Sequence, residues 1–161
     1  MKKSSTIKRS VFISPSYIDS DIMKNVFHML KQKYEKTCDE EDGMIISIDE
    51  ILKVENMISK DCCYVIFDIT FIATVIKPEK NTILQIKPSY LLSSKGIFSK
   101  IYDNIYIFVP ESNIKDSWKY ENESYVNKSG NVINKDTTID IVINDIKFNS
   151  TKYNCVCSLV E

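Results

Sequence analysis

The stretch YVIFDITFIATVI, Tyr64 to Ile76, is the strongest β-strand signal in the chain. β-Branched and aromatic side chains fill most of its thirteen positions, and Asp68 is its only charged residue. Such residues favour extended backbone, and an apolar run of this kind is typical of a strand inside a sheet. We therefore expect a long central strand that is buried on both faces for much of its length.

A strand, a helix and a second strand are predicted ahead of this central strand. Val11–Ile13 is a short apolar run that stops before Pro15, which is typical of the end of a strand. In the range 19–36, apolar residues recur every three or four positions, and the Asp-Ser-Asp at its start supplies a helix cap. The acidic run Asp39–Asp42 is interpreted as a solvated turn, and a strand is expected to begin at Met44–Ile48.

A change of pattern after the central strand predicts a second domain. Lys77–Asn81 brings proline, charges and asparagine together, so we place the domain boundary there, with domains at 1–80 and 81–161. The second half shows no strong helix pattern, and the segment 113–138 is polar, so it is interpreted as a long excursion between strands. Short strands in this half predict a small Greek-key barrel, an α+β protein overall; they are expected at 82–86, 96–102, 105–109, 139–148 and 153–160.

Composition excludes several classes of protein. The 161 residues are 43% hydrophobic and 27% charged, near the average of folded globular domains. With 21 Lys and Arg against 22 Asp and Glu, the chain cannot hold nucleic acid by bulk charge, so any such contact requires a local patch. The polar start MKKSSTIKRS has no apolar segment behind it, and the five cysteines are odd in number, which favours a reduced intracellular protein.

The residues needed for catalysis or metal binding are scarce. His28 is the single histidine and falls within the predicted helix, where a structural role is the commoner one. Cys62-Cys63 and Cys155-x-Cys157 lack further ligands nearby, and three glycines leave no phosphate-binding loop. The sequence predicts no catalytic residue, no metal site and no cofactor.

A binding surface is the more plausible function. No acidic residue occurs in 82–102, where three lysines alternate with the aromatic residues Tyr90, Phe98 and Tyr102. Aromatic faces beside lysines are what single-stranded nucleic acid requires on a small barrel. The alternative is that these aromatics belong to the core and the lysines are merely solvated, because every small barrel has both.

Five stretches appear in an order and spacing that resemble one known family. They are VFISPSYIDSDIMKNVFHMLKQKYEKTC at 11–38, DGMIISIDEI at 42–51, VIFDITFIATVIKPEKNTI at 65–83, LLSSKGIFSKIYDNIYIFVPESNI at 91–114 and YNCVCSLVE at 153–161. Together they resemble the stalk subunit family of multisubunit DNA-directed RNA polymerases, which includes the seventh subunit of eukaryotic polymerase II and its archaeal counterpart. The chain departs from the family pattern at Asn81–Ile83 and Tyr102–Asn104, where the family has glycine-containing turns.

The resemblance implies a non-catalytic subunit with two domains. An N-terminal tip domain, an antiparallel sheet with one helix, would dock on the polymerase core near the clamp, and a C-terminal OB-fold barrel would contact nascent RNA. The implied partners are the two largest polymerase subunits, a small core subunit and RNA, with a fourth-subunit stalk partner left open. By position, docking falls on Cys38, Asp42, Gly43, Val54, Asn56, Ile58 and Lys60. RNA contact falls on Lys87, Lys95, Phe98, Lys100, Tyr102, Tyr106 and Phe108.

Two further hypotheses and the source of the chain stay open at this point. A free-standing OB-fold RNA-binding module acting in translation or decay would bind RNA alone, and an enzyme using His28 or Cys155 would need a reactive group. The bias towards Ile, Lys and Asn is typical of an AT-rich genome, and a large DNA virus with its own polymerase is the expected source. A viral member would act in the virion and host cytoplasm, and a cellular one in the nucleus.

Overall fold

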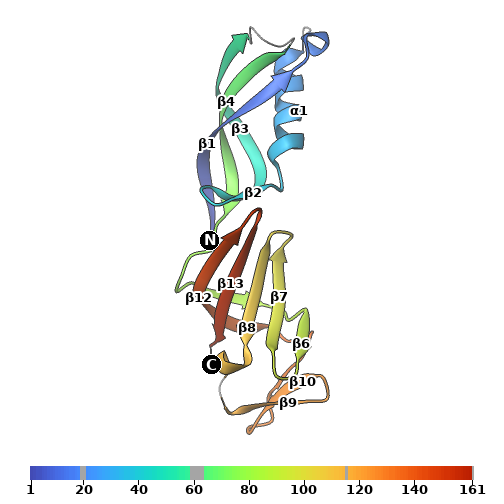
Figure 1. The fold of residues 1–161 in the computed structure, drawn as a ribbon, viewed down its shortest axis with the longest axis vertical. Coiled ribbons are helices and arrows are strands. Elements are labelled where there is room, and N and C mark those ends of the chain that lie inside the picture. The colour runs from blue at the N-terminus through green and yellow to red at the C-terminus, as the bar shows by residue number, and fades with distance from the viewer. Residues whose placement is uncertain (19–20, 59–63, 115, 161) are drawn as a thin grey trace. The chain divides into compact units, whose positions relative to one another are not determined.

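The computed structural model describes residues 1–18, 21–58, 64–114 and 116–160. The chain divides into two compact units, Lys2–Lys77 and Pro78–Glu161. The first is an antiparallel sheet with one helix, and the second is a curled sheet that closes into an OB-like barrel (Figure 1). The α+β class predicted from sequence is confirmed. No helix in the described part of the chain is long and apolar enough to cross a membrane.

The N-terminal unit is built around β4 (Val65–Ile76), the predicted central strand. Its four strands have the order β1-β4-β3-β2, and β4 pairs along its whole length with β1 (Lys2–Ile13) and β3 (Gly43–Ile58). The range 44–58 of β3 faces twelve residues of β4, and three bulges take up the extra residues. Because a bulge bends its strand and increases twist, β3 curves strongly.

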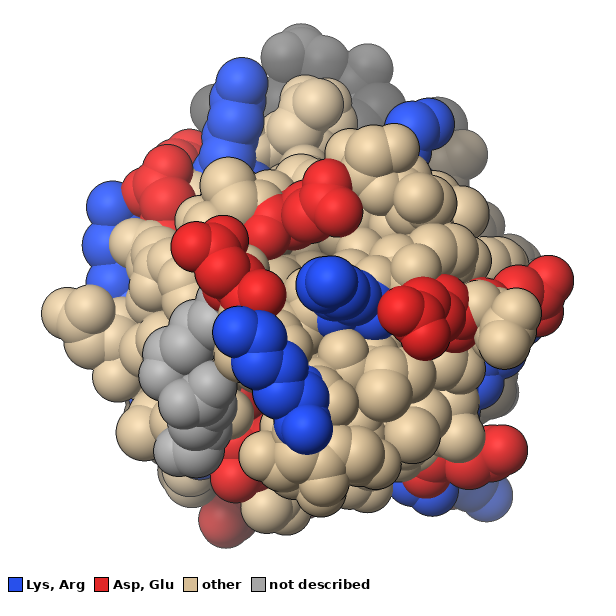
Figure 2. Space-filling model, turned by 90° about the horizontal axis from the view of Figure 1, so that it is seen from below, with Lys and Arg blue, Asp and Glu red and all other residues tan. Residues whose placement is uncertain are grey.

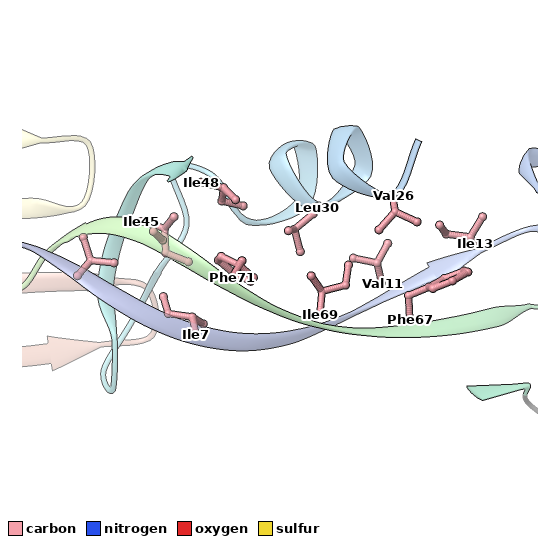
Figure 3. Close-up of a cluster of buried hydrophobic side chains, with 12 residues drawn as sticks. Ile7, Val11, Ile13, Val26, Leu30, Ile45, Ile48, Phe67, Ile69 and Phe71 are labelled. Atoms are coloured by element: carbon pink, nitrogen blue, oxygen red, sulfur yellow. The ribbon is translucent and has the colours of Figure 1, made fainter. Parts of the chain in front are cut away.

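The helix α1 (Ile22–Tyr34) covers one face of this sheet. Val26 and Leu30 are fully buried against alternate residues of β1, β3 and β4, which Figure 3 shows pointing into one apolar layer. The helix is shorter than the predicted range 19–36. Asp21 at its start makes no side-chain capping bond, and the other two expected capping residues lie outside the described residues.

One prediction for this unit, the burial of β4 on both faces, is wrong. The outward residues of β4, such as Ile66 and Thr70, are half-buried, because α1 covers only the opposite face. The run Val11–Ile13 is the end of a strand, as predicted, and that strand, β1, starts at Lys2 and pairs with β4 throughout. The polar first residues of β1 mask an alternation in which Ile7 and Val11 point into the core while Lys8 between them stays exposed.

The C-terminal unit has a six-stranded sheet with the order β5-β12-β13-β8-β7-β6. The strands are β5 (Ile83–Ile86), β6 (Tyr90–Leu92), β7 (Gly96–Tyr102), β8 (Ile105–Pro110), β12 (Ile139–Asn149) and β13 (Lys152–Leu159). The two edge strands, β5 and β6, are separated by only three residues of chain, 87–89. The sheet therefore closes on itself through one bent strand, and β8 and β13 form its one parallel pair among the described residues.

The segment 113–138 is a folded meander, which corrects the prediction of a simple excursion. It forms a three-stranded sheet of β9 (Trp118–Glu121), β10 (Ser124–Asn127) and β11 (Val132–Ile133). The Tyr125 hydroxyl donates to the Leu92 carbonyl at 3.0 Å and that of Tyr120 to the Leu91 carbonyl at 3.3 Å. These two bonds fasten the meander to edge strand β6, and Tyr125 is only 1% exposed.

The tight approach of β7 to β8 requires glycine at position 96, and Gly96→Ala tests this. Gly96 has a φ of +123°, and a Cβ there would lie 2.0 Å from the Val109 carbonyl oxygen. Strain and overpacking together should lower the free energy of unfolding by roughly 2–5 kcal/mol. Urea unfolding followed through the fluorescence of Trp118, which lies in the same unit, measures the loss.

Gly130→Ala is the matched control. Gly130 also has a positive φ, +84°, but nothing lies within 4 Å of the added Cβ. Gly130→Ala should therefore lower the free energy of unfolding by only about 1 kcal/mol, the cost of placing a residue other than glycine at positive φ. An equal loss for the two variants would contradict the close packing at Gly96.

Candidate nucleic-acid interface and docking surfaces

Four of the residues predicted to contact RNA share the outer face of the barrel. On β7 and β8, alternate residues such as Ile97 and Ile107 point inward and are buried. The residues between them point outward: Phe98 and Lys100 from β7, and Tyr106 and Phe108 from β8. Because neighbouring strands pair in register, these four side chains form a compact group.

Strand pairing arranges the outer face in two rows. The apolar row crosses four strands, with Tyr90 opposite Phe98, Phe98 opposite Phe108 and Phe108 opposite Val156. The polar row lies one outward position further along the strands, roughly 7 Å away. It runs from Lys100 to Tyr106, Asn154 and Lys147.

The two rows line a groove of about 760 Å³. Within it the rings of Phe98 and Phe108 stack with centroids 4.4 Å apart, and Tyr90 at its rim is 65% exposed. Exposed aromatic faces of this kind bind planar groups, and nucleic-acid bases are the most common ones. The groove is therefore chemically suited to unpaired bases.

Two lysines, Lys100 and Lys147, belong to the polar row, and a third, Lys152, lies beside it. Lys100 donates a hydrogen bond to Asp103 at 2.7 Å, and this bond raises the pKa of Lys100, so that it stays protonated. The Lys152 ammonium lies 5.2 Å from the centroid of the Tyr106 ring, and Lys147 is exposed on β12 opposite Asn154. The positive charge needed for phosphate contact is thus local.

The remaining residues predicted to contact RNA do not line this groove. Lys87 lies in the bend between β5 and β6, where its carbonyl accepts a bond from Ser99. Lys95 lies in the turn before β7, beyond the apolar row. Tyr102 follows a bulge at the end of β7 and lines a separate small hollow with Lys100 and Asp103.

Sequence reasoning missed the wall of the groove that β13 supplies and the lysine that β12 places beside it. The alternation of β13 does predict that Asn154 and Val156 face outward. It does not predict which strand lies next to them, because the parallel pairing of β8 with β13 joins residues about fifty positions apart. Lys147 and Lys152 were missed for the same reason.

Charge elsewhere is mixed. On the face shown in Figure 2, basic and acidic side chains are interspersed among uncharged ones, and neither sign gathers into a broad patch. This agrees with a formal net charge of −1. Contact with nucleic acid through this protein must therefore depend on a local site rather than on its overall field.

The residues predicted to dock on a polymerase core fall at different places in the N-terminal unit. Cys38 and Gly43 are buried at the end of the sheet near Ile76, whereas Val54 is half-buried and packs against the core. The backbone of Asn56 and Ile58 pairs with the opposite end of β4, and Lys60 lies outside the described residues. Cys38 and Gly43 are therefore separated from Asn56 and Ile58 by about the length of β4, roughly 40 Å.

The acidic turn at the first of these ends is held by ion pairs. Arg9, the only arginine in the chain, bonds the carboxylates of Asp39 at 2.7 Å and Asp42 at 2.5 Å. The Asp42 amide donates to Asp39, and the Lys77 ammonium donates to the Glu41 carbonyl at 2.6 Å. The turn is therefore ordered rather than merely solvated.

The other end of the unit exposes a group of large apolar side chains. Phe12 is the next-to-last residue of β1 and Tyr64 precedes β4. Tyr17 and Ile18 lie between β1 and α1, and Met23 lies in the first turn of α1. Each is at least 43% exposed. We call these five residues the apolar end; such a cluster is typical of a surface that a protein partner covers.

The groups considered for catalysis are not arranged for it. His28 is exposed on α1. Burial raises the pKa of Cys155 to about 11 and that of Cys157 to about 12, so the nucleophilic thiolate is rare at neutral pH. Within the described ranges, no group of three His, Cys, Asp or Glu side chains could hold a metal ion.

Comparison with known proteins identifies the N-terminal unit. Residues 8–69 match a family described as the SHS2 domain found in the N terminus of Rpb7p/Rpc25p/MJ0397. Nothing matched in a search of curated proteins. The match confirms the resemblance to RNA polymerase stalk subunits for this part of the chain. The sheet and helix of residues 8–69 therefore belong to the SHS2 domain family found at the N terminus of Rpb7p, Rpc25p and MJ0397.

Proposed function

We propose that this protein is a non-catalytic stalk subunit of a DNA-dependent RNA polymerase. The observation that carries the proposal is the SHS2 match at residues 8–69, followed in the same chain by a closed OB-like barrel. The N-terminal domain would dock on the core, against the two largest subunits and a small core subunit. The barrel would contact nascent RNA, and the protein would act wherever its polymerase acts, in the nucleus or in a virus-infected cytoplasm.

The apolar end is the docking surface that the geometry favours. Its five large side chains are exposed, and burying each of them on a partner would stabilise a complex by roughly 1–3 kcal/mol. In the acidic turn at the other end of the sheet, Arg9 pairs with Asp39 and Asp42, so these two carboxylates are already engaged within the domain. We therefore assign the turn a secondary role in docking, and the viral origin expected from composition stays a prediction.

The double variant Tyr17→Ser, Met23→Ser should lose the polymerase. Both side chains are at least 50% exposed, so their loss leaves the core of the domain intact. The measurement is affinity purification of the tagged full chain from its native source, with the two largest polymerase subunits quantified by mass spectrometry. We expect recovery of those subunits with the unchanged chain and at least a tenfold drop for the variant.

Ile83→Ser is the matched control, because Ile83 is 61% exposed but lies in the barrel. It should leave recovery unchanged. Recovery of the unchanged chain without polymerase, alone or with ribosomal material, would overturn the proposed function and favour a free RNA-binding module.

The groove on the barrel is the proposed RNA-contacting surface. The stacked pair Phe98 and Phe108 offers a platform for bases, and Lys100, Lys147 and Lys152 offer partners for phosphates. Base stacking on an aromatic side chain contributes roughly 1–3 kcal/mol per base. Few cations are involved, so the contact should be weak and only moderately dependent on salt.

The variant Phe98→Ala, Phe108→Ala should weaken binding of an unstructured RNA by about tenfold or more. Both side chains are half-buried outside the barrel core, and thermal unfolding checks that the variant stays folded. Fluorescence anisotropy of a labelled RNA at several salt concentrations measures the affinity and its salt slope.

A Lys87→Ala, Lys95→Ala variant serves as the comparison, because these lysines lie outside the groove. It should change affinity less than the loss of the aromatic pair. If the loss of Lys87 and Lys95 weakened binding more than the loss of Phe98 and Phe108, RNA would lie at those two lysines rather than in the groove.

A further inference from the structure

The β13 wall of the groove presents an amide beside the aromatic residues. Asn154 lies in register with Tyr106 on one neighbouring strand and with Lys147 on the other. Its side chain is exposed and lines the groove. It is thus the one amide side chain among the residues that line the groove in the described part of the chain.

The Asn154 amide is chemically available. Within the described ranges it makes no side-chain hydrogen bond, unlike Asn127, whose oxygen accepts two backbone amides, and Asn144, which bonds Ser158. An asparagine amide offers an acceptor oxygen and a donor nitrogen in one plane. That pair matches the adjacent donor and acceptor on the edge of a base, and adenine N6 and N7 are its usual partners.

The surroundings of Asn154 hold a nucleotide in reach of it. Tyr106 supplies a ring for stacking, Lys152 lies over that ring, and Lys147 and Lys100 stand at the two ends of the row. Stacking and phosphate contact accept any base. Among these residues, only the amide has a hydrogen-bonding pattern that distinguishes one base edge from another.

We infer that Asn154 determines the base preference of the groove, favouring adenine at the position stacked beside Tyr106. The inference rests on the proposed RNA contact and adds to it a specificity that aromatic and lysine side chains do not supply. Asn154 touches the base edge, Tyr106 supports the ring, and the flanking lysines bind the backbone.

The test compares binding of three single-stranded RNAs of equal length, oligo-A, oligo-C and oligo-U, to the full chain and to Asn154→Leu. Equal length keeps the phosphate contribution constant. We expect the unchanged chain to bind oligo-A at least fivefold more tightly than oligo-C, and Asn154→Leu to bind all three alike. Self-stacking of oligo-A affects both proteins equally, so it cancels in the comparison between them.

Two further variants keep the test interpretable. Asn149→Leu alters an exposed asparagine on β12 outside the groove and should preserve the preference. Asn154→Asp keeps the shape but removes the amide donor, and it should lose the preference as well. Equal binding of the three RNAs by the unchanged chain, or a preference that survives Asn154→Leu, overturns the inference; failure to bind any RNA overturns the proposed RNA contact instead.

Discussion

The parallel pairing of β8 with β13 is the constraint on which the candidate site depends. It joins Tyr106 to Asn154 and Phe108 to Val156, and so extends an aromatic pair into a groove that spans four strands. Closure of the barrel through the bent β5–β6 segment gives the sheet the curvature that places these strands together. The meander fastened to β6 by Tyr120 and Tyr125 holds the opposite wall, where Tyr90 lies. The β8–β13 pairing and the bonds of Tyr120 and Tyr125 join residues that are far apart in the sequence, and removing one of them should change the width of the groove.

The N-terminal unit has a simple core. One long strand, β4, pairs on both sides, and one helix buries Val26 and Leu30 against it. The face of the sheet under α1 is well filled, so side chains available to a partner lie outside it, including those at the two ends of the sheet. At one end Arg9 forms ion pairs with Asp39 and Asp42 of the acidic turn. At the other end five large apolar side chains stay exposed. This distribution favours a partner that covers the apolar end. The family of residues 8–69 supports a polymerase as that partner.

Local periodicity explains which features could be predicted from the sequence. The apolar run ending at Ile76, the helix around Val26 and the alternating strand ending at Leu159 all appear as predicted, because each depends on its own residues. The beginning of β1 at Lys2 was not predicted because its inward positions before Ile7 are the polar residues Lys3 and Ser5. The meander was not predicted because its turn at Asn122 and Glu123 uses positive φ without glycine. Asn154 and Lys147 joined the site through strand pairing, and Arg9 bonds Asp39 and Asp42 from a distant strand. Such long-range contacts leave no spacing pattern in one sequence.

The central claim is that the outer face of the barrel contacts a transcript while the chain is part of a polymerase. The most direct measurement is photo-crosslinking of an RNA carrying 4-thiouridine in a transcribing complex purified through this chain, with the linked peptides mapped by mass spectrometry. Crosslinks are expected within β7, β8 and β13, near Phe98, Tyr106 and Asn154. Crosslinks confined to other subunits, or to the N-terminal unit of this chain, would contradict the central claim.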